Sequence, residues 1–402
     1  MRKFWGRAAV VAATILIAGC GAESGDQPTE PEVDLAQLDV GNYPREPRTV
    51  KPPNEMVAKF LEAQRLGNAM PLPLDFDPAL EYGTRDAPRA FLHPDEGAHP
   101  SLLFKWTDSG KFAAVAKNMV SGFTTSAQSH PELALSYEVV NSAIIFADHA
   151  SAAAAAPALV GSLDPQLYGP AEPVSINRYP GTLSSWYAKD QVLTTATVRG
   201  PLLYVTQVAE WERKELGADG RAHAIELTEK AIGATSAALV GFRPTPTDRL
   251  LQLPSDPEGL RGLSVPRPRE GEIGSWANVP GTYDGRGALH FASRPKSMRT
   301  LYADNGVDRY TLDRGILLRA RDAAAARRVV EDMRAPDRRY VVRTAPKALP
   351  QARCYERLGY EPRYICNLTV GRYIAQIDSA QLEDAQQAIS AQYAILAVHE
   401  KK

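Results

Sequence analysis

The pentapeptides Tyr204-Val-Thr-Gln-Val208 and Tyr373-Ile-Ala-Gln-Ile377 carry the same pattern in the two halves of the chain. Their β-branched and aromatic residues predict strands. Each pentapeptide precedes a segment with apolar residues at helical spacing, and the matched positions are Ala231, Ile232, Leu239 and Ala388, Ile389, Leu396. The chain is therefore expected to contain one strand–helix unit twice.

A second pair of segments lies upstream of the pentapeptides. Ile144-Ile-Phe-Ala-Asp148 and Gly315-Ile-Leu-Leu-Arg-Ala-Arg-Asp322 both read as a strand that ends at an aspartate and leads into an alanine-rich helix. Aspartate is a preferred N-cap, so these helices should begin after Asp148 and Asp322. Each copy then reads β-α-β-β-α, which we interpret as an internal duplication. Chance similarity between two α+β domains is the alternative.

These patterns predict the fold class and the domain layout. Helices with one apolar face must cover an antiparallel sheet with one apolar face, which gives the α+β class as two similar two-layer α/β sandwich domains with antiparallel sheets. About 380 residues also exceed one usual core. We expect an N-terminal domain at 37–242, a Pro/Gly-rich linker at 243–289 and a C-terminal domain at 290–402.

The N-terminus predicts export. Three basic residues precede an eleven-residue apolar run at 8–18, which has the length of a signal-peptide core and is too short to span a bilayer. The run ends Ile17-Ala-Gly-Cys20, which resembles the lipobox of bacterial lipoproteins. That resemblance implies a signal peptide at 1–19, cleavage before Cys20 and lipidation of its thiol. An ordinary secretory signal with a chance cysteine is the alternative.

Residues 20–36 are mainly polar and acidic, and we expect them to form a flexible tether. One acyl chain holds a protein to a bilayer only marginally, whereas two hold it stably. A diacylglyceryl group on Cys20 would therefore make the membrane a partner of the chain. The expected location is the outer face of the cytoplasmic membrane.

The charge balance excludes one class of partner. The sequence has 46 basic and 47 acidic side chains, and loss of the three basic residues of the signal peptide takes the net charge from −1 to −4. This balance gives no whole-chain electrostatic reason to bind nucleic acid.

Cys354 and Cys366 are the two cysteines left after the lipobox, and an even pair in an exported protein predicts a disulfide. Residues 359–362 are a turn signal midway between them, and 364–370 is strand-like. A hairpin that turns there would place the two cysteines opposite one another, at a separation that suits a disulfide. A metal site is the rival interpretation, but two thiols without a nearby histidine are a poor zinc ligand set.

No sequence motif identifies a catalysed reaction. His93-Pro-Asp-Glu-Gly-Ala-His99 offers metal-ligand types, but its proline and glycine exclude a helical histidine pair and favour a solvated loop. Asp148-His149 suggests acid–base chemistry, although helix capping is the better account. Asp108-Ser-Gly-Lys111 is only a fragment of a phosphate loop, and Gly-x-Ser-x-Gly is absent. We predict no catalytic residues, no metal site and no cofactor.

Two further sets of residues have both a structural and a functional interpretation. Residues 314–343 contain nine arginines, which could meet anionic envelope lipid or polysaccharide but more simply form a salt-bridged surface. Four tryptophans could line an apolar ligand pocket, although isolated aromatics belong more simply to a core; they are Trp106, Trp186, Trp211 and Trp276.

Four segments carry a family resemblance, and they are residues 38–48, 118–126, 370–377 and 382–393. Together with the lipobox and the paired cysteines, they make the chain similar to a family of uncharacterised lipoproteins from mycolate-bearing actinobacteria. The resemblance implies the location and the layout. It implies no activity and no site residues.

We therefore expect a lipid-anchored extracytoplasmic lipoprotein that binds an envelope lipid, an apolar ligand or a protein partner, or assists envelope assembly, without catalysis. The alternative is an envelope hydrolase with an unrecognised catalytic constellation. A pocket without a nucleophile–base pair would favour binding, and a cleft that holds such a pair would favour the enzyme.

Overall fold

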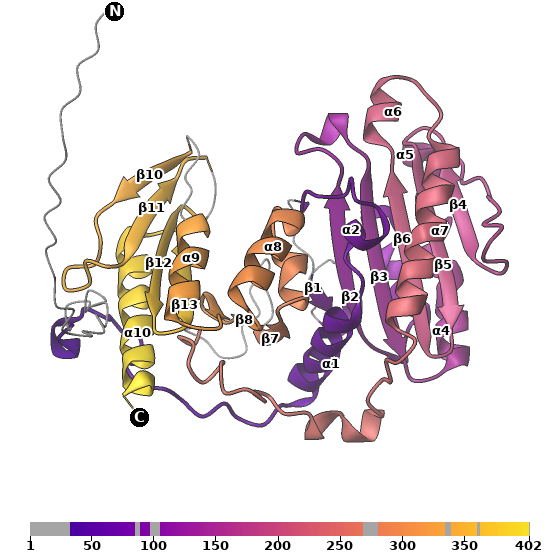
Figure 1. Ribbon diagram of the computed structural model, residues 1–402. Helices are drawn as coiled ribbons and strands as arrows, with labels where there is room; N and C mark the ends of the chain where they lie inside the picture. Colours follow the sequence, from indigo (N-terminus) through magenta and orange to yellow (C-terminus); the bar gives the residue numbers. More distant parts are fainter. Residues whose placement is uncertain are drawn as a thin grey trace, which may run out of the picture.

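The computed structural model describes residues 33–84, 89–96, 105–267, 280–333, 339–359 and 362–401. Within these ranges the chain forms a six-stranded and a seven-stranded antiparallel sheet, one in each half (Figure 1). The predicted α+β class, with antiparallel sheets in two similar halves, is confirmed. Cys20, the predicted signal peptide and residues 20–32 of the predicted tether lie outside the described residues.

The strands of the first sheet are β1 Arg89–Phe91, β2 Met119–Gln128, β3 Glu138–Phe146, β4 Leu183–Tyr187, β5 Val192–Arg199 and β6 Leu202–Ala209. The strands of the second sheet are β7 Gly281–Asp284, β8 Arg309–Leu312, β9 Ile316–Arg319, β10 Tyr340–Arg343, β11 Arg353–Arg357, β12 Tyr364–Val370 and β13 Tyr373–Ser379.

The two sheets have the same strand order. The first runs β1-β2-β3-β6-β5-β4, and the second runs β7-β8-β9-β13-β12-β11, with β10 added at its outer edge. The helices also correspond, because α3, α4 and α7 of the first half occupy the chain positions that α8, α9 and α10 occupy in the second. A shared order of this length supports the interpretation as an internal duplication.

The ladder register corrects the alignment of the two pentapeptides. Leu203 pairs with Ile144 in the first sheet, and Ile374 pairs with Leu318 in the second. Ile144 and Leu318 each lie four residues before a capping aspartate, so Leu203 corresponds to Ile374. The expected match of Tyr204 with Tyr373 is therefore wrong by two residues. The hairpin turns set the register: each begins with a glycine of positive φ, Gly200 or Gly371, as a type II′ turn requires.

The helices of the first half are α1 Glu55–Ala69, α2 Pro73–Phe76, α3 Ser109–Val115, α4 His149–Ala155, α5 Pro165–Tyr168, α6 Trp211–Glu215 and α7 Arg221–Ala238, and those of the second are α8 Pro295–Asn305, α9 Ala323–Met333 and α10 Leu382–Glu400. The two predicted caps are confirmed, since Asp148 accepts from the Ser151 amide and Asp322 from the Ala325 amide, each at 2.7 Å. Of the helices in the described ranges, none is long and apolar enough to cross a bilayer.

Helices cover both faces of each sheet. In the first sheet, Val139 packs on the side of α7, whereas Ile144 and Phe146 pack on the side of α4. In the second sheet, Leu317 packs with α10, whereas its neighbour Leu318 packs with α9. Each half therefore has a layer beyond the predicted two. The physical reason is that the central strands of the first sheet are buried along almost their whole length rather than at alternate residues.

Residues 33–48, which we call the strap, pack on the second half although they precede the first half in sequence. Leu38 and Val40 lie in the core between the second sheet and α10. The Tyr43 hydroxyl donates to Asp384 at the start of α10, at 2.6 Å. The strap then runs below both halves to α1 (Figure 1). The second half is thus completed by residues that precede the first.

The connector, residues 255–267, also belongs to the core of the second half. Leu263 and Val265 are buried there, and Gln392 of α10 bonds to the Leu263 carbonyl and the Val265 amide at 2.7 and 3.0 Å. Strand β7 lies further along, within residues 243–289 that we expected to be a linker.

The disulfide between Cys354 and Cys366 is present as predicted. The two residues face one another across β11 and β12, with their Cα atoms 4.1 Å apart, and both are buried under α10. The bridge fastens β11 to the hairpin that leads into α10.

Candidate ligand pocket between the two halves

A pocket of about 570 Å³ lies where the two halves meet. Helices α2 and α7 form one wall, and the β7–α8 segment with α8 forms the other. Its lining residues are Pro71, Asp75, Ala234, Ala238, Gly285, Arg286, Leu289, Arg299, Tyr302, Ala303 and Val307. This volume is within the roughly 300–1,000 Å³ of small-molecule sites, which often lie between domains.

Small residues keep the pocket open. Ala234 and Ala238 are four residues apart on α7 and so point to the same side, and Ala303 faces them from α8. Gly285 is required within the second wall, because any Cβ there would collide with the Val307 carbonyl oxygen of the same wall. The remaining wall is apolar and well buried, with Leu289, Tyr302 and Val307.

One carboxylate and two guanidinium groups line the pocket. Asp75 accepts from Arg286 at 3.1 Å through one oxygen and from Arg299 through the other. Burial raises the pKa of Asp75, but the hydrogen bonds from Arg299 and the Leu72 amide and the charges of both arginines outweigh it and hold the pKa below its usual value. The three charged groups together carry a net charge of +1.

Arg286 has a structural task as well. Its guanidinium donates to the carbonyl of Met70 at 3.0 Å, at the C-terminal end of α1, where carbonyl groups lack helical partners. The second half therefore caps a helix of the first and contacts Asp75 with the same side chain.

Beneath the pocket, His290 joins the halves in a fully buried position. Its Nε2 lies 3.0 Å from the Gly67 carbonyl, which can only accept, so Nε2 carries the proton and Nδ1 accepts from the Thr125 hydroxyl at 2.8 Å. Burial lowers the pKa of His290 to about 3, with a smaller contribution from the charge of Arg286. The imidazole is neutral, and it bridges α1 and β2 from the second half.

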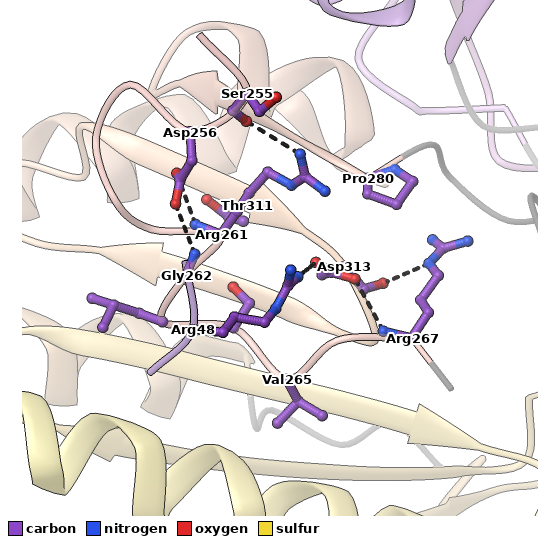
Figure 2. Close-up of polar contacts among 12 residues, drawn as sticks. Arg48, Ser255, Asp256, Arg261, Gly262, Val265, Arg267, Pro280, Thr311 and Asp313 are labelled. Carbon is purple, nitrogen blue, oxygen red and sulfur yellow. Dashed lines mark hydrogen bonds and ion pairs between the residues drawn. The ribbon is translucent and has the colours of Figure 1, made fainter. Parts of the chain in front are cut away.

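A polar cluster, shown in Figure 2, fixes the strap to the connector on the second half. Arg48 donates its amide to the Gly262 carbonyl at 3.0 Å and its guanidinium to Asp313 at 2.7 Å. Asp313 also accepts from the Arg267 amide, while Asp256 accepts from the amides of Arg261 and Gly262. Burial raises the pKa of Asp313 although the charges of Arg48 and Arg261 lower it. The cluster holds together three distant parts of the chain.

The loop at residues 93–99, which we expected to be solvated, is only partly described, and the expectation is wrong for His93. His93 is buried, with Nε2 3.1 Å from the Ala113 carbonyl and Nδ1 accepting from the Asp95 amide, so its ring has a structural role. His99 lies outside the described residues. In the described part of the chain, no group of three or more His, Cys, Asp or Glu side chains could hold a metal ion.

The other singled-out residues have structural roles where they are described. Asp108 caps α3 by accepting from the Lys111 amide. Trp106 and Trp186 are buried in two core clusters, and Trp211 packs on Trp106 with a ring separation of 5.6 Å. Trp276 is outside the described residues. The arginine-rich stretch is salt-bridged, since Arg319 pairs with Asp308 and Glu258, Arg314 with Asp384 and Arg343 with Glu356.

One acid–base pair lies away from the pocket. The buried Glu210 carboxylate is 2.6 Å from Nδ1 of His223, an arrangement that orients an imidazole. Among the described residues, however, no serine, threonine or cysteine is bonded to that ring. A Ser-x-x-Lys sequence at Ser293–Lys296 gives no dyad either, because Lys296 is exposed and pairs with Glu81 at 3.2 Å.

The residues that line the pocket carried no signal in the sequence. Asp75, Arg286 and Arg299 are separated by up to 224 residues, and no motif links them. The alanines of α7 read as ordinary helix formers. Only the packing of the two halves brings these residues together.

Comparison with known proteins gives the family. The model described as domain of unknown function (DUF7373) N-terminal matches residues 49–255, and the model described as domain of unknown function (DUF7373) C-terminal matches residues 261–399. The two matches meet at the connector, between the two sheets. No curated protein and no solved structure matches the chain. Because the N-terminal model alone covers half of the sequence, the chain belongs to the DUF7373 family.

Proposed function

We propose that the protein is a lipoprotein anchored by Cys20 to the outer face of the cytoplasmic membrane, where it binds a small ligand without transforming it. The pocket between the two halves is the observation that carries this proposal. Its described lining contains no serine, threonine, cysteine, histidine or lysine, so it lacks the usual nucleophile–base pair of an acyl hydrolase, and its single carboxylate, Asp75, cannot supply the two carboxyl groups of a glycoside hydrolase. An apolar wall with a few charged groups is typical of a binding site.

The anchor rests on the N-terminal sequence and on the resemblance to lipoproteins of mycolate-bearing actinobacteria. Residues 21–32 separate Cys20 from the strap, and a fully extended tether of that length reaches about 40 Å. Because the strap packs on the second half, that half would stay close to the bilayer.

Native mass spectrometry of the protein purified from its own membranes tests the binding function. We expect a bound small molecule on the wild-type protein and on Ala237→Trp, which changes an exposed residue of α7 beside the pocket. We expect none on Ala238→Trp, which fills the pocket. A ligand retained by Ala238→Trp, or no ligand on any form, would contradict the proposal.

The anchor has a separate test. Replacement of Cys20 by Ser should release the protein from the membrane fraction and abolish acyl labelling. Membrane retention with undiminished label would show that the lipobox interpretation is wrong.

A hydrolase remains the second candidate because of the Glu210–His223 pair. If the chain were an esterase that uses this imidazole as a general base, His223→Gln would reduce turnover of activated esters by roughly 100-fold or more. We expect instead that wild-type protein and His223→Gln turn over such esters equally slowly.

A further inference from the structure

The pocket has two chemically different regions. Ala234 and Ala238 of α7 face an apolar wall that contains Leu289 and Val307. Arg286 and Arg299 lie where the pocket is exposed, with 43% and 42% of their side chains accessible. A ligand that satisfies both regions needs an apolar body and a polar head.

The charge of the head follows from the ion pairs. Two guanidinium groups share the single carboxylate of Asp75, which leaves an excess positive charge at the exposed part of the pocket. The described lining contains no second acidic residue to neutralise it. An anion is therefore favoured there, and a cation is disfavoured.

Arg286 and Arg299 differ in how many of their N–H donors already bond to protein acceptors. Arg286 donates to the carbonyls of Asn68 and Met70 as well as to Asp75. Arg299 bonds only to Asp75 within the described residues, so most of its N–H donors are available to a ligand. Its planar donor set suits the oxygens of a carboxylate or a phosphate.

Resting on the binding function proposed above, we propose that the ligand is a single-chain anionic amphiphile. Its hydrocarbon chain lies along the alanine wall of α7, and its carboxylate or phosphate head accepts hydrogen bonds from Arg299. Arg286 holds Asp75 and the end of α1 in place and acts as a positioning residue.

Three probes of equal chain length separate the contributions: dodecanoate, dodecyl phosphate and dodecanol. They are titrated calorimetrically, below their aggregation limits, into residues 20–402 with Cys20→Ser, a form that keeps every described residue. We expect both anions to bind at least about tenfold more tightly than dodecanol, the usual size of a charge-assisted hydrogen bond. The tighter of the two anions identifies the head group as a carboxylate or a phosphate.

Arg299→Gln should remove the preference for the anions, whereas Arg294→Gln, on an exposed arginine just before α8, should keep it. Equal binding of all three probes that is lost in Ala238→Trp would overturn the inference about the head group and leave the binding function standing. Ala303→Trp blocks the opposite wall, at an exposed position, and serves if Ala238→Trp does not fold. Binding that survives both blocking variants would overturn the inference and remove the pocket from the proposed function as well.

Discussion

The outer edge of the first sheet is closed by a segment near it in sequence, whereas the core under α10 in the second half is closed by segments from far away. At the outer edge of the first sheet, Glu172 pairs with Trp186 of β4 across a short loop. In the second half, the core under α10 includes Leu38 of the strap, Leu263 of the connector and the Cys354–Cys366 bridge. The same strand order is thus completed locally at the outer edge of the first sheet, whereas the core under α10 needs the strap and the connector.

This difference shows that two halves with the same strand order can be completed by different additional segments. The second half carries an added edge strand, β10, and a disulfide, and it accepts the strap. The family models divide the chain at the connector, yet the strap before the first model packs on the second half. The boundary in sequence is therefore not a boundary in packing.

The largest expected effect on stability comes from truncating Leu38, a strap residue that is buried in the core under α10. Leu38→Ala leaves a cavity under α10 and should lower the free energy of unfolding by about 2–5 kcal/mol, measured by urea denaturation. Hydrogen exchange should increase in β12, β13 and α10 while β3 and β6 stay protected. Leu135→Ala, at a half-exposed leucine of the first half, should change stability by less than about 0.5 kcal/mol. An equal increase of hydrogen exchange in both sheets would contradict the proposed difference between the two halves.

The disulfide should contribute somewhat less, about 3 kcal/mol in the chain-entropy model for a loop this short. Replacing both Cys354 and Cys366 by Ser should lower the melting temperature by roughly 6–12 °C for a half that unfolds as its own unit. The measurement needs the whole chain, because a 290–402 fragment would lack β7, the connector and the strap. Alkylated free thiols at both positions in envelope-purified protein would show that the bridge does not form.

Acid should loosen the junction between the halves. Burial lowers the pKa of His290 from its ordinary value of 6.5 to about 3, so between these two values the unfolded chain binds a proton that the folded chain does not. Its contribution is fully present above pH 6.5 and is lost as the pH falls toward 3. Between pH 6.5 and 4.5 the free energy of unfolding should therefore fall by about 2–3 kcal/mol. In His290→Gln, whose amide can still donate to the Gly67 carbonyl, the free energy of unfolding should depend less steeply on pH. An unchanged slope would refute this account.

The smallest expected effect on stability concerns the helix caps, a feature that the two halves share. Asp148 and Asp322 cap equivalent helices, and bonds from the Ser151 and Ala325 amides lower their pKa values. Asp148→Ala and Asp322→Ala should each reduce the melting temperature of their own half by roughly a degree or two, to a similar extent. A much larger loss in one half would mean that the two helices are not equivalent.

The sequence predicted the features that depend on neighbouring residues. The caps at Asp148 and Asp322 depend on a few adjacent positions. The pairing of Cys354 with Cys366 required only a turn midway between them. The strand–helix repeat was found for the same reason, although its register was misjudged because the ladder, not the side-chain pattern, decides which residues correspond.

Features that depend on distant contacts could not be predicted. Nothing in Leu38 or Val40 shows that they pack against α10, more than 340 residues away. The pocket follows from how α7 meets α8, and its charged residues come from three separate segments. The burial of the central strands on both faces could not be predicted from side-chain polarity, because polar residues such as Thr206 and Asn141 are buried and bonded to one another.

Hydrogen exchange of the wild-type chain with and without an anionic amphiphile tests the central claim most directly. The account predicts that dodecanoate slows exchange at the two walls where the halves meet, in residues 234–238, 285–289 and 299–307, and leaves the outer strands β4 and β10 unchanged. Protection confined to one half, for example around Glu210 and His223, or no change at the junction on saturation, would contradict it.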